Sequence, residues 1–390
     1  EKVIISQERV AENQVFVWPP TKSTTAKYTH EAEIKTSIDQ RFFPIKVNKV
    51  KLTKEPSQRM IKQSRTIKVG DSIGITYGRT IKVQFPYMKE DIPLFIMFRA
   101  LGIATEKEAL EMILPDMDMI GSNFTNFLIP SIDEARSSTV SFGTGEEKSE
   151  IVGITTQEMA LKYLIERLNI TYDSTFKQEP FQCQMKYVNE IINRELFPHI
   201  GLMLPTLGQT FRKKAFFLGY MTRKLLDCYF GVRPYDDRDH YGNKRVDLTG
   251  PLITKLFRAN FIKLIKDMRQ QILHKLCDKV AKTDSQMLVQ LLRKIIQGCN
   301  IDSKIKYGLS TGNWGTQKGS MSSTEKGIAQ VLNRLSVAGA LSHTRRIQSP
   351  LERAGSKIVQ PRKLHWTHYG MCCLNETPEG QQIGVVKNLA

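Results

Sequence analysis

The chain has 390 residues and a mass of 44.6 kDa, with 41% hydrophobic and 25% charged residues. These proportions are close to those of an average globular protein, so they exclude a chain that is disordered throughout, and the length predicts two or three domains. No apolar run reaches the roughly 18 residues that a membrane helix needs, so no membrane partner is expected. The net charge of +18 favours a polyanionic partner such as nucleic acid, although some basic proteins have no such partner.

The six cysteines are scattered, and none belongs to a Cys-x-x-Cys pair. This spacing does not support a zinc ribbon or finger, and the low number fits a reducing compartment. The sequence begins with Glu1 rather than Met, directly in a strand-like stretch, and stops at Ala390 without a tail. We therefore interpret it as an internal segment of a larger protein.

Strand patterns dominate the first hundred or so positions. Thr80 to Phe85 alternates apolar and polar residues, which predicts a strand with one buried face. The continuous apolar run from Pro93 to Phe98 fits either a buried strand or the start of a helix. Residues 54–79 are predicted to form an extended hairpin or loop, and residues 143–150 a surface loop.

Helical periodicity begins near residue 155, where Thr155 and Glu158 have the spacing of a capping box. A long helix is predicted from Leu252 to Leu276. Its apolar stripe includes Phe257 and Ile265, and its basic side is interpreted as a solvated face.

A third helix is predicted over residues 286–297, with Gly298 as its stop. After residue 300 the apolar periodicity weakens, so we expect loops over a scaffold, where functional residues tend to lie. Together the patterns predict an α+β protein of several domains, with mixed helices and antiparallel sheets.

Common catalytic signatures are missing: the chain has no Gly-x4-Gly-Lys-Ser/Thr, no Gly-x-Gly-x-x-Gly and no His-Glu-x-x-His. One stretch holds three acids that could suggest a metal site, but three bases lie among them. Such matched charges are more typical of a salt-bridge network, so neither a catalytic nor a metal-binding residue is predicted. The six residues of this stretch are Asp236, Asp237, Arg238, Asp239, Lys244 and Arg245.

The C-terminal part combines glycines, bases and aromatic residues. Thr311 to Ser323 has three glycines with an indole and Lys318 between them, and glycines let a loop backbone approach a ligand closely. Arg345 and Arg346 are adjacent, a pair suited to bind phosphate oxygens. Arg362 to Gly370 mixes bases with aromatic residues, a pattern that single-stranded or hybrid nucleic acid favours.

Two histidines and two glutamates in this part have competing interpretations. His365 and His368 have no carboxylate or cysteine at ligand spacing, so packed, hydrogen-bonded histidines are favoured over metal ligands. Glu376 and Glu379 flank a turn that Pro378 restricts. They could orient arginines or act as a general acid/base pair, and the orienting role is favoured because no nucleophile is evident.

Several of these strings resemble, in the same order, the second-largest, beta-type subunit of multisubunit DNA-directed RNA polymerases. They include ETPEG (Glu376–Gly380), TGNWG and GIAQVLNRLSVAGALSHTRR (Gly327–Arg346). The residues of these motifs are most similar to those of the RNA polymerase II-like branch of eukaryotes and large DNA viruses. The resemblance implies four segments: the end of the first part of the protrusion (1–16), the lobe (17–243), the second part of the protrusion (244–311) and an incomplete fork (312–390).

The same resemblance implies that seven residues lie near nucleic acid or nucleotide and that none is catalytic. Lys318 would contact phosphate from the first fork loop, and Arg353 would lie beside downstream DNA in the second. Arg362 would lie close to the incoming nucleotide, and Glu379 would organise these basic groups. The residues implied to face the nascent RNA are Gln330, Arg345 and Arg346.

The implied activity is nucleotidyl transfer from NTPs onto an RNA 3′ end, during which this segment lines the cleft and positions template, DNA–RNA hybrid and incoming NTP. Mg²⁺ is implied in the assembled enzyme, held mainly by the largest subunit and not by this segment. The implied partners are the largest and other polymerase subunits, template DNA, nascent RNA and NTPs. A cellular protein would be nuclear, and a viral one would lie in a cytoplasmic viral factory or a virion. The alternative is a non-catalytic nucleic-acid-binding scaffold derived from such a subunit.

Overall fold

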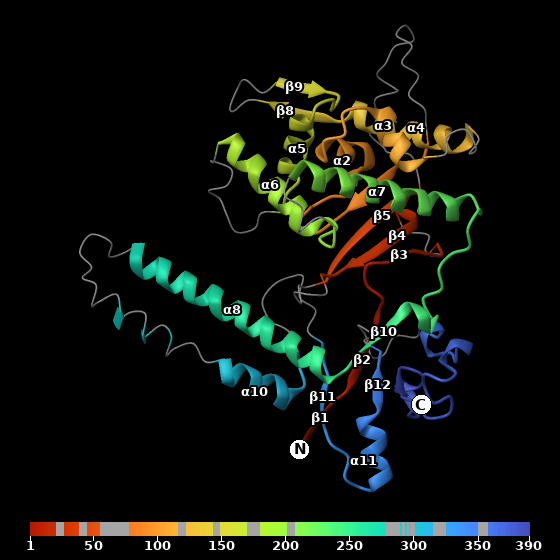
Figure 1. The fold of residues 1–390 in the computed structure, drawn as a ribbon, viewed down its shortest axis with the longest axis vertical. Helices are drawn as coiled ribbons and strands as arrows, with labels where there is room; N and C mark the ends of the chain where they lie inside the picture. The colour runs from red at the N-terminus through yellow and green to blue at the C-terminus, as the bar shows by residue number, and fades with distance from the viewer. Residues whose placement is uncertain are drawn as a thin grey trace. The chain divides into compact units, whose positions relative to one another are not determined.

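The computed structural model describes residues 1–20, 27–38, 45–54, 78–115, 122–142, 149–169, 180–200, 207–277, 301–314, 325–349 and 358–390, with a few residues between 289 and 296. The described chain divides into two compact units (Figure 1). The inserted unit is Glu12–Arg238, and the split unit combines Glu1–Ala11 with Asp239–Ala390. The borders of the four segments predicted from the resemblance stay predictions.

The inserted unit contains an antiparallel five-stranded sheet in the order β3-β4-β5-β6-β7. Alternation of buried and part-exposed residues is clear on β4, where Ala32 and Ile34 are buried, and on β6, where Ile81 and Val83 are buried. The strand predicted between residues 80 and 85 is therefore confirmed as β6. The strands are β3 (Val15–Trp18), β4 (Tyr28–Thr36), β5 (Lys46–Thr53), β6 (Ile81–Gln84) and β7 (Ile92–Pro93).

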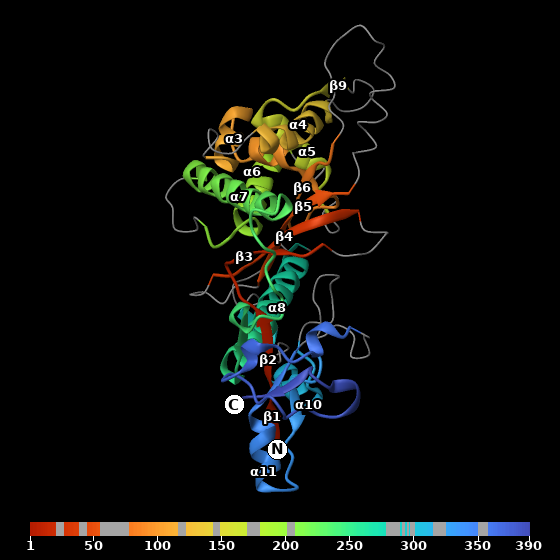
Figure 2. The ribbon, with the colours of Figure 1, turned by 90° about the vertical axis from the view of Figure 1, so that its right-hand side faces the viewer.

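Helices cover this sheet, and α7 packs across β3, β4 and β5 (Figure 2). The apolar run after Pro93 becomes the helix α2, in which every residue except Arg99 is buried. A helix that is buried on all sides shows no apolar stripe, which is why the sequence left helix and strand open. The helices are α2 (Leu94–Ala100), α3 (Glu106–Ile113), α4 (Ser122–Ser137), α5 (Gln157–Glu166), α6 (Phe181–Glu195) and α7 (Leu207–Tyr229).

Two boundaries in the inserted unit differ from the predictions. Thr156, not Thr155, is the N-cap of α5, and its hydroxyl accepts a hydrogen bond from the Met159 backbone N–H at 3.3 Å. The predicted loop 143–150 ends in strand β9 (Ser149–Val152), which pairs with β8 (Thr139–Phe142). The remainder of that loop, and most of the predicted hairpin 54–79, lie outside the described residues.

The acid-rich stretch forms ion pairs that hold separate elements together, as predicted for Asp236 and Lys244. The Asp236 carboxylate accepts from the Val17 backbone N–H at 2.8 Å and pairs with Lys224 at 3.7 Å and Arg233 at 3.2 Å. Lys244, one of the bases in the stretch, pairs instead with Glu8 at 3.5 Å. Among the described residues, His, Cys, Asp and Glu side chains form no group of three or more that could hold a metal ion.

The split unit is built on a four-stranded mixed sheet in the order β10-β2-β12-β13. β2 is antiparallel to β10 and parallel to β12, and β12 is antiparallel to β13. A second, two-stranded sheet pairs β1 (Lys2–Ile4) with β11 (Ala329–Val331). The mixture of sheets and helices confirms the predicted α+β class. The four strands are β2 (Ser6–Val10), β10 (Lys244–Asp247), β12 (Arg346–Gln348) and β13 (Val386–Asn388).

The long helix predicted from Leu252 is confirmed as α8 (Thr249–Cys277), but its apolar stripe is only partly buried. Leu256 packs in a small core with Trp314, whereas Phe257 is 48% and Ile265 is 49% exposed. The stripe is therefore packed near Leu256 and exposed further along the described part of the helix.

Two further helices of the split unit lie where loops were predicted, α10 (Ile301–Thr311) and α11 (Val337–Thr344). Ser336 caps α11 by accepting from the Gly339 backbone N–H at 3.0 Å. Glycine and serine in these segments weaken the helical signal, and packing against β1 and α8 overrides it. Most of the helix predicted over 286–297 lies outside the described residues. None of the helices within the described ranges combines the length and apolarity that a membrane crossing demands.

Candidate nucleic-acid interface

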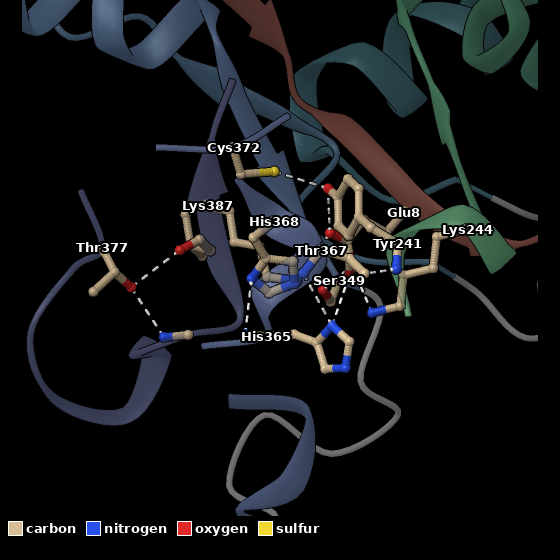
Figure 3. A network of polar contacts seen from close by, with 12 residues as sticks. Glu8, Tyr241, Lys244, Ser349, His365, Thr367, His368, Cys372, Thr377 and Lys387 are labelled. Carbon is tan, nitrogen blue, oxygen red and sulfur yellow. Dashed lines mark hydrogen bonds and ion pairs between the residues drawn. The ribbon is translucent and has the colours of Figure 1, made fainter. Parts of the chain in front are cut away.

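The split unit's sheet has a buried carboxylate at its centre, that of Glu8 on β2 (Figure 3). Its Oε1 accepts from Lys387 Nζ at 2.9 Å and from the Tyr241 hydroxyl at 2.8 Å. Its Oε2 accepts from the Ser349 hydroxyl at 2.6 Å and lies 3.5 Å from Lys244 Nζ. We call these five residues the Glu8 hub, and its members come from β2, the turn η3 (Tyr241–Asn243), β10, β13 and the residue that follows β12.

The surroundings of the hub favour an ionised Glu8 carboxylate and a protonated Tyr241 hydroxyl. Burial alone would raise the pKa of Glu8, but the ammonium groups of Lys387 and Lys244 outweigh it, and with the hydrogen bond from Ser349 they lower that pKa to about 2. Burial first, and then the Glu8 carboxylate, raise the pKa of Tyr241, so its hydroxyl stays protonated and donates to Glu8. The same hydroxyl accepts from Cys372 Sγ at 3.0 Å. The hub is thus an ionised carboxylate with its acceptor positions filled.

The two histidines beside the hub form a reciprocal cap on the turn η5 (Trp366–His368). His365 Nδ1 accepts from the Thr367 N–H at 3.3 Å, and His368 Nδ1 accepts from the His365 N–H at 3.4 Å. His368 is buried, and burial lowers its pKa. The prediction of packed, hydrogen-bonded core histidines is confirmed for His368, whereas His365 is hydrogen-bonded but only half-buried.

The opposite face of the sheet carries a different polar set. Arg346 lies opposite Asn388 across β12 and β13, and Gln348 lies opposite Gln7 on β2. Because side chains alternate along a strand, these four residues share one face, and Glu8 and Lys387 point to the other. Within the described part of the chain, three buried atoms here have no hydrogen-bond partner: Arg346 Nε, Gln348 Oε1 and Asn388 Oδ1. An unpaired buried polar group costs about 1–3 kcal/mol, so these three atoms lower the stability of the sheet.

Gln330 on β11 is fixed by a buried histidine of α11. His343 Nδ1 accepts from the Asn333 backbone N–H at 3.1 Å, which leaves the ring proton on Nε2, and Nε2 donates to Gln330 Oε1 at 3.1 Å. The Gln330 amide nitrogen donates to the Gly327 carbonyl at 3.0 Å. Burial first, and then the charge of Arg346, lower the pKa of His343, so the ring is neutral and this arrangement holds at neutral pH.

Arg362 ends the turn η4 (Gln360–Arg362), next to the segment that follows the ETPEG corner. Its Nη1 donates to the backbone carbonyls of Gln381 at 2.5 Å and Ile383 at 3.0 Å. Gly384 has a φ of +70°, and a Cβ at that position would lie 2.2 Å from the Arg362 carbonyl oxygen. Only glycine allows the two segments to approach this closely.

The carboxylates of the ETPEG corner are arranged differently from the prediction. Glu376 accepts from the Ser342 hydroxyl at the end of α11. Glu379 precedes the turn η6 (Gly380–Gln382), and its side chain is exposed. Arg362 donates to two backbone carbonyls, and the organising role of Glu379 stays a prediction.

The other residues predicted to lie near nucleic acid divide into two groups. Arg345 is exposed at the end of α11, and its guanidinium donates to the Ala390 carbonyl at 2.5 Å. Lys318 and Arg353 lie outside the described residues. Sequence reasoning missed Glu8, Gln348 and Asn388. A charged residue at an inward position of the strand SQERV was a signal for Glu8, but its partners lie more than 230 positions away.

Comparison with known proteins assigns the chain to a family. The family model "RNA polymerase Rpb2, domain 2" matches residues 41–247, and "RNA polymerase Rpb2, domain 3" matches residues 330–390. Over the whole chain, identity is 36% to DNA-directed RNA polymerase II subunit 2 of Arabidopsis thaliana and 35% to subunit RPB2 of Schizosaccharomyces pombe. Identity to the archaeal subunit Rpo2 of Saccharolobus shibatae is 30%. The chain spans 28% of the length of each of these relatives. It therefore belongs to the Rpb2 family, the second-largest subunits of DNA-directed RNA polymerases.

Proposed function

We propose that this chain is part of a working DNA-directed RNA polymerase, where it lines the nucleic-acid cleft and positions the template, the DNA–RNA hybrid and the incoming NTP. The observation that carries this proposal is the group of polar side chains at the end of α11 and along β12, where Arg345 is exposed and Arg346 and Gln348 are half-buried. A phosphate-bearing strand supplies acceptors for an arginine, and its ribose hydroxyls supply donors for amide oxygens. The net charge of +18 supports the same partner.

In this proposal the segment acts through position and charge. Arg345 and Arg346, with Gln330 beside them, face the nascent RNA, and Arg362 lies near the arriving triphosphate. Lys318 and Arg353 add phosphate contacts, and Glu379 organises the bases around it. Contacts to the phosphate backbone fix position without reading sequence, as a polymerase that copies any template requires.

The reaction is transfer of a nucleotidyl group to the RNA 3′ hydroxyl with release of pyrophosphate. Mg²⁺, held mainly by the largest subunit in this proposal, supplies charge neutralisation on the reacting phosphates. The residues of this segment are assigned to orientation and to stabilisation of charge near the site, where fixed cations act most strongly on charge that develops in the transition state.

The partners follow from the same assignment: the largest subunit, the other polymerase subunits, template DNA, nascent RNA and NTPs. The eukaryotic RNA polymerase II subunits among the relatives support a nuclear location for a cellular protein. A viral protein would instead act in a cytoplasmic factory or a virion.

Primer extension by the complete assembly tests the proposal. The full-length subunit is assembled with its partner subunits on a template strand with a short RNA primer, and RNA synthesis is followed. Extension that requires this subunit supports a polymerase. Tight, salt-sensitive binding of the scaffold with no extension would favour the alternative, a non-catalytic nucleic-acid-binding relative.

A further inference from the structure

We propose that Glu8 is a positioning residue for the RNA-facing side chains of β12 and β13: the hub on one face of the sheet holds Arg346 and Gln348 in register on the other. This inference rests on the proposed function, because it takes the Arg346 face as the one that meets RNA. Glu8 contacts neither Arg346 nor Gln348 directly, so its effect on them is transmitted through the backbone of the strands.

The register of the sheet places the two sets on opposite faces. Lys387 lies opposite Ile347 across β12 and β13, and Ile347 lies opposite Ser6 on β2. Side chains of Ser6 and Glu8 share one face because they are two residues apart on the strand. The neighbours Arg346 and Gln348 therefore point away from the hub.

The strands that carry the RNA-facing residues are short, which makes side-chain contacts important for their register. β12 and β13 have three residues each, and β12 pairs with β2 over only two positions. A slip of one residue would move Arg346 to the hub face and Lys387 to the RNA face. The hub opposes such a slip, because Glu8 accepts from Ser349, the residue just after β12, and from Lys387 in the middle of β13.

The energetics of the hub make it a strong constraint. The Glu8 side chain is 3% exposed and the Lys387 side chain 9%, so separating them leaves a buried charge without its partner. Removing one member of a buried ion pair is strongly destabilising, because the remaining charge stays buried without compensation. On the other face, Arg346 Nε is buried without a hydrogen-bond partner within the described residues, so the strand that carries Arg346 matters for where this side chain lies.

A double-mutant cycle in the assembled polymerase tests this coupling. The full-length subunit carries Ser349→Ala, Glu8→Gln or Arg346→Ala, or Arg346→Ala combined with either of the others. Single-nucleotide addition is measured on a preformed template–RNA scaffold. Ser349→Ala removes one hydrogen bond to Glu8 and leaves the ion pairs of Glu8 in place. The matched control is Ser310→Ala, because the Ser310 hydroxyl donates only a local hydrogen bond, to the Tyr307 carbonyl of its own helix.

We expect Ser349→Ala to slow addition about 5-fold and Glu8→Gln at least about 10-fold, the order expected when one hydrogen bond to a charged group is lost. In the Arg346→Ala background, adding Ser349→Ala or Glu8→Gln should slow nucleotide addition less than about 2-fold further, because the side chain that the hub positions is gone. Ser310→Ala should keep the unmodified rate. If Glu8→Gln fails to assemble, Ser349→Ala still decides.

Two outcomes overturn the inference, and they can be told apart. Full additivity of Ser349→Ala and Arg346→Ala, or an unmodified rate for Ser349→Ala, would show that the hub does not act through Arg346, while the proposed function stands. An unmodified rate for Arg346→Ala itself would contradict the RNA-facing role in the proposed function and the inference with it.

Discussion

Arg362 shows at the scale of one residue how the fold holds a positive charge in place. Two backbone carbonyls accept from its Nη1, and Pro361 restricts the backbone immediately before it. A charge held in this way needs no reorganisation when negative charge develops on a reacting phosphate.

Replacing Arg362 by alanine in the assembled polymerase should therefore slow nucleotide addition more than it weakens template binding. We expect a rate lowered about 10-fold or more, because a preorganised donor contributes about 2–4 kcal/mol to a transition state. Template affinity should change less than about 5-fold, since one phosphate contact among many is lost. The measurement is single-nucleotide addition on a preformed scaffold, together with template titration.

Lys363→Ala serves as the control for Arg362→Ala. Lys363 is exposed, and its substitution removes the same charge one position away. It should keep a rate within about 3-fold of the unmodified enzyme, as expected for a solvated charge. An unmodified rate for Arg362→Ala would leave that residue with a structural role only.

Glu8 gives the chain an acid-sensitive contribution to stability. Its pKa is about 2 in the folded protein against an ordinary value of 4.5, so the folded state binds fewer protons than the unfolded state between these values. The stabilisation is therefore complete above pH 4.5 and is lost as the pH falls through about 2. The shift corresponds to about 3 kcal/mol.

The Glu8 effect is measured as the change in thermal midpoint of the chain between pH 6 and pH 3, with and without Glu8→Gln. The unmodified chain should lose more stability over this interval than Glu8→Gln, which has no carboxyl to titrate at this site. Equal losses in both proteins would contradict a strongly lowered pKa for Glu8.

At the scale of elements, the close approach of two turns sets the place of Arg362. Gly384→Ala should force them apart, because the new Cβ would lie 2.2 Å from the Arg362 carbonyl oxygen. Gly380→Ala is a matched control: its φ is +83°, but a Cβ there meets nothing within 4 Å. We expect addition about 10-fold slower for Gly384→Ala and less than about 3-fold slower for Gly380→Ala, which carries only backbone strain of about 1–2 kcal/mol. Similar rates for the two variants would show that the close approach does not matter.

Local patterns predicted some elements and missed others for identifiable reasons. β6 was predicted because one of its faces is buried and the other is solvated. α8 was predicted from the helical period of its apolar residues, although only Leu252 and Leu256 near its start are buried in the described part of the helix. The helix in the run that starts at Pro93 could not be distinguished from a strand, because it is buried on all sides. α11 was missed because Gly339 and Ser342 weaken its helical pattern, although Ser336 caps it and His343 is buried.

The candidate site was predictable only where bases cluster in sequence. Arg345, Arg346 and Arg362 stand out as charges near glycines and aromatics, and the resemblance gave them roles. Glu8 could not be found in this way, because its partners Tyr241 and Lys387 come from distant parts of the chain and meet only in the folded sheet.

At the scale of the whole molecule, the excess of positive charge predicts binding that salt weakens steeply. With a net charge of +18, the chain should bind a DNA–RNA hybrid weakly and mainly through phosphate contacts. Release of about four to six counterions gives a log–log slope of roughly −3 to −5 against salt concentration. Titration of the hybrid at several salt concentrations measures this slope, and a flat response would contradict the electrostatic account.

The central claim is that the sheet face of β12 and β13 meets the growing RNA. A photoreactive nucleotide at the RNA 3′ end of an assembled elongation complex, followed by peptide mapping of the crosslinks, tests it most directly. We expect crosslinks within residues 330–348 and 386–390 of this chain, and we expect Arg346→Ala to reduce them. Efficient crosslinks to other polymerase subunits, with none in these two segments, would contradict it.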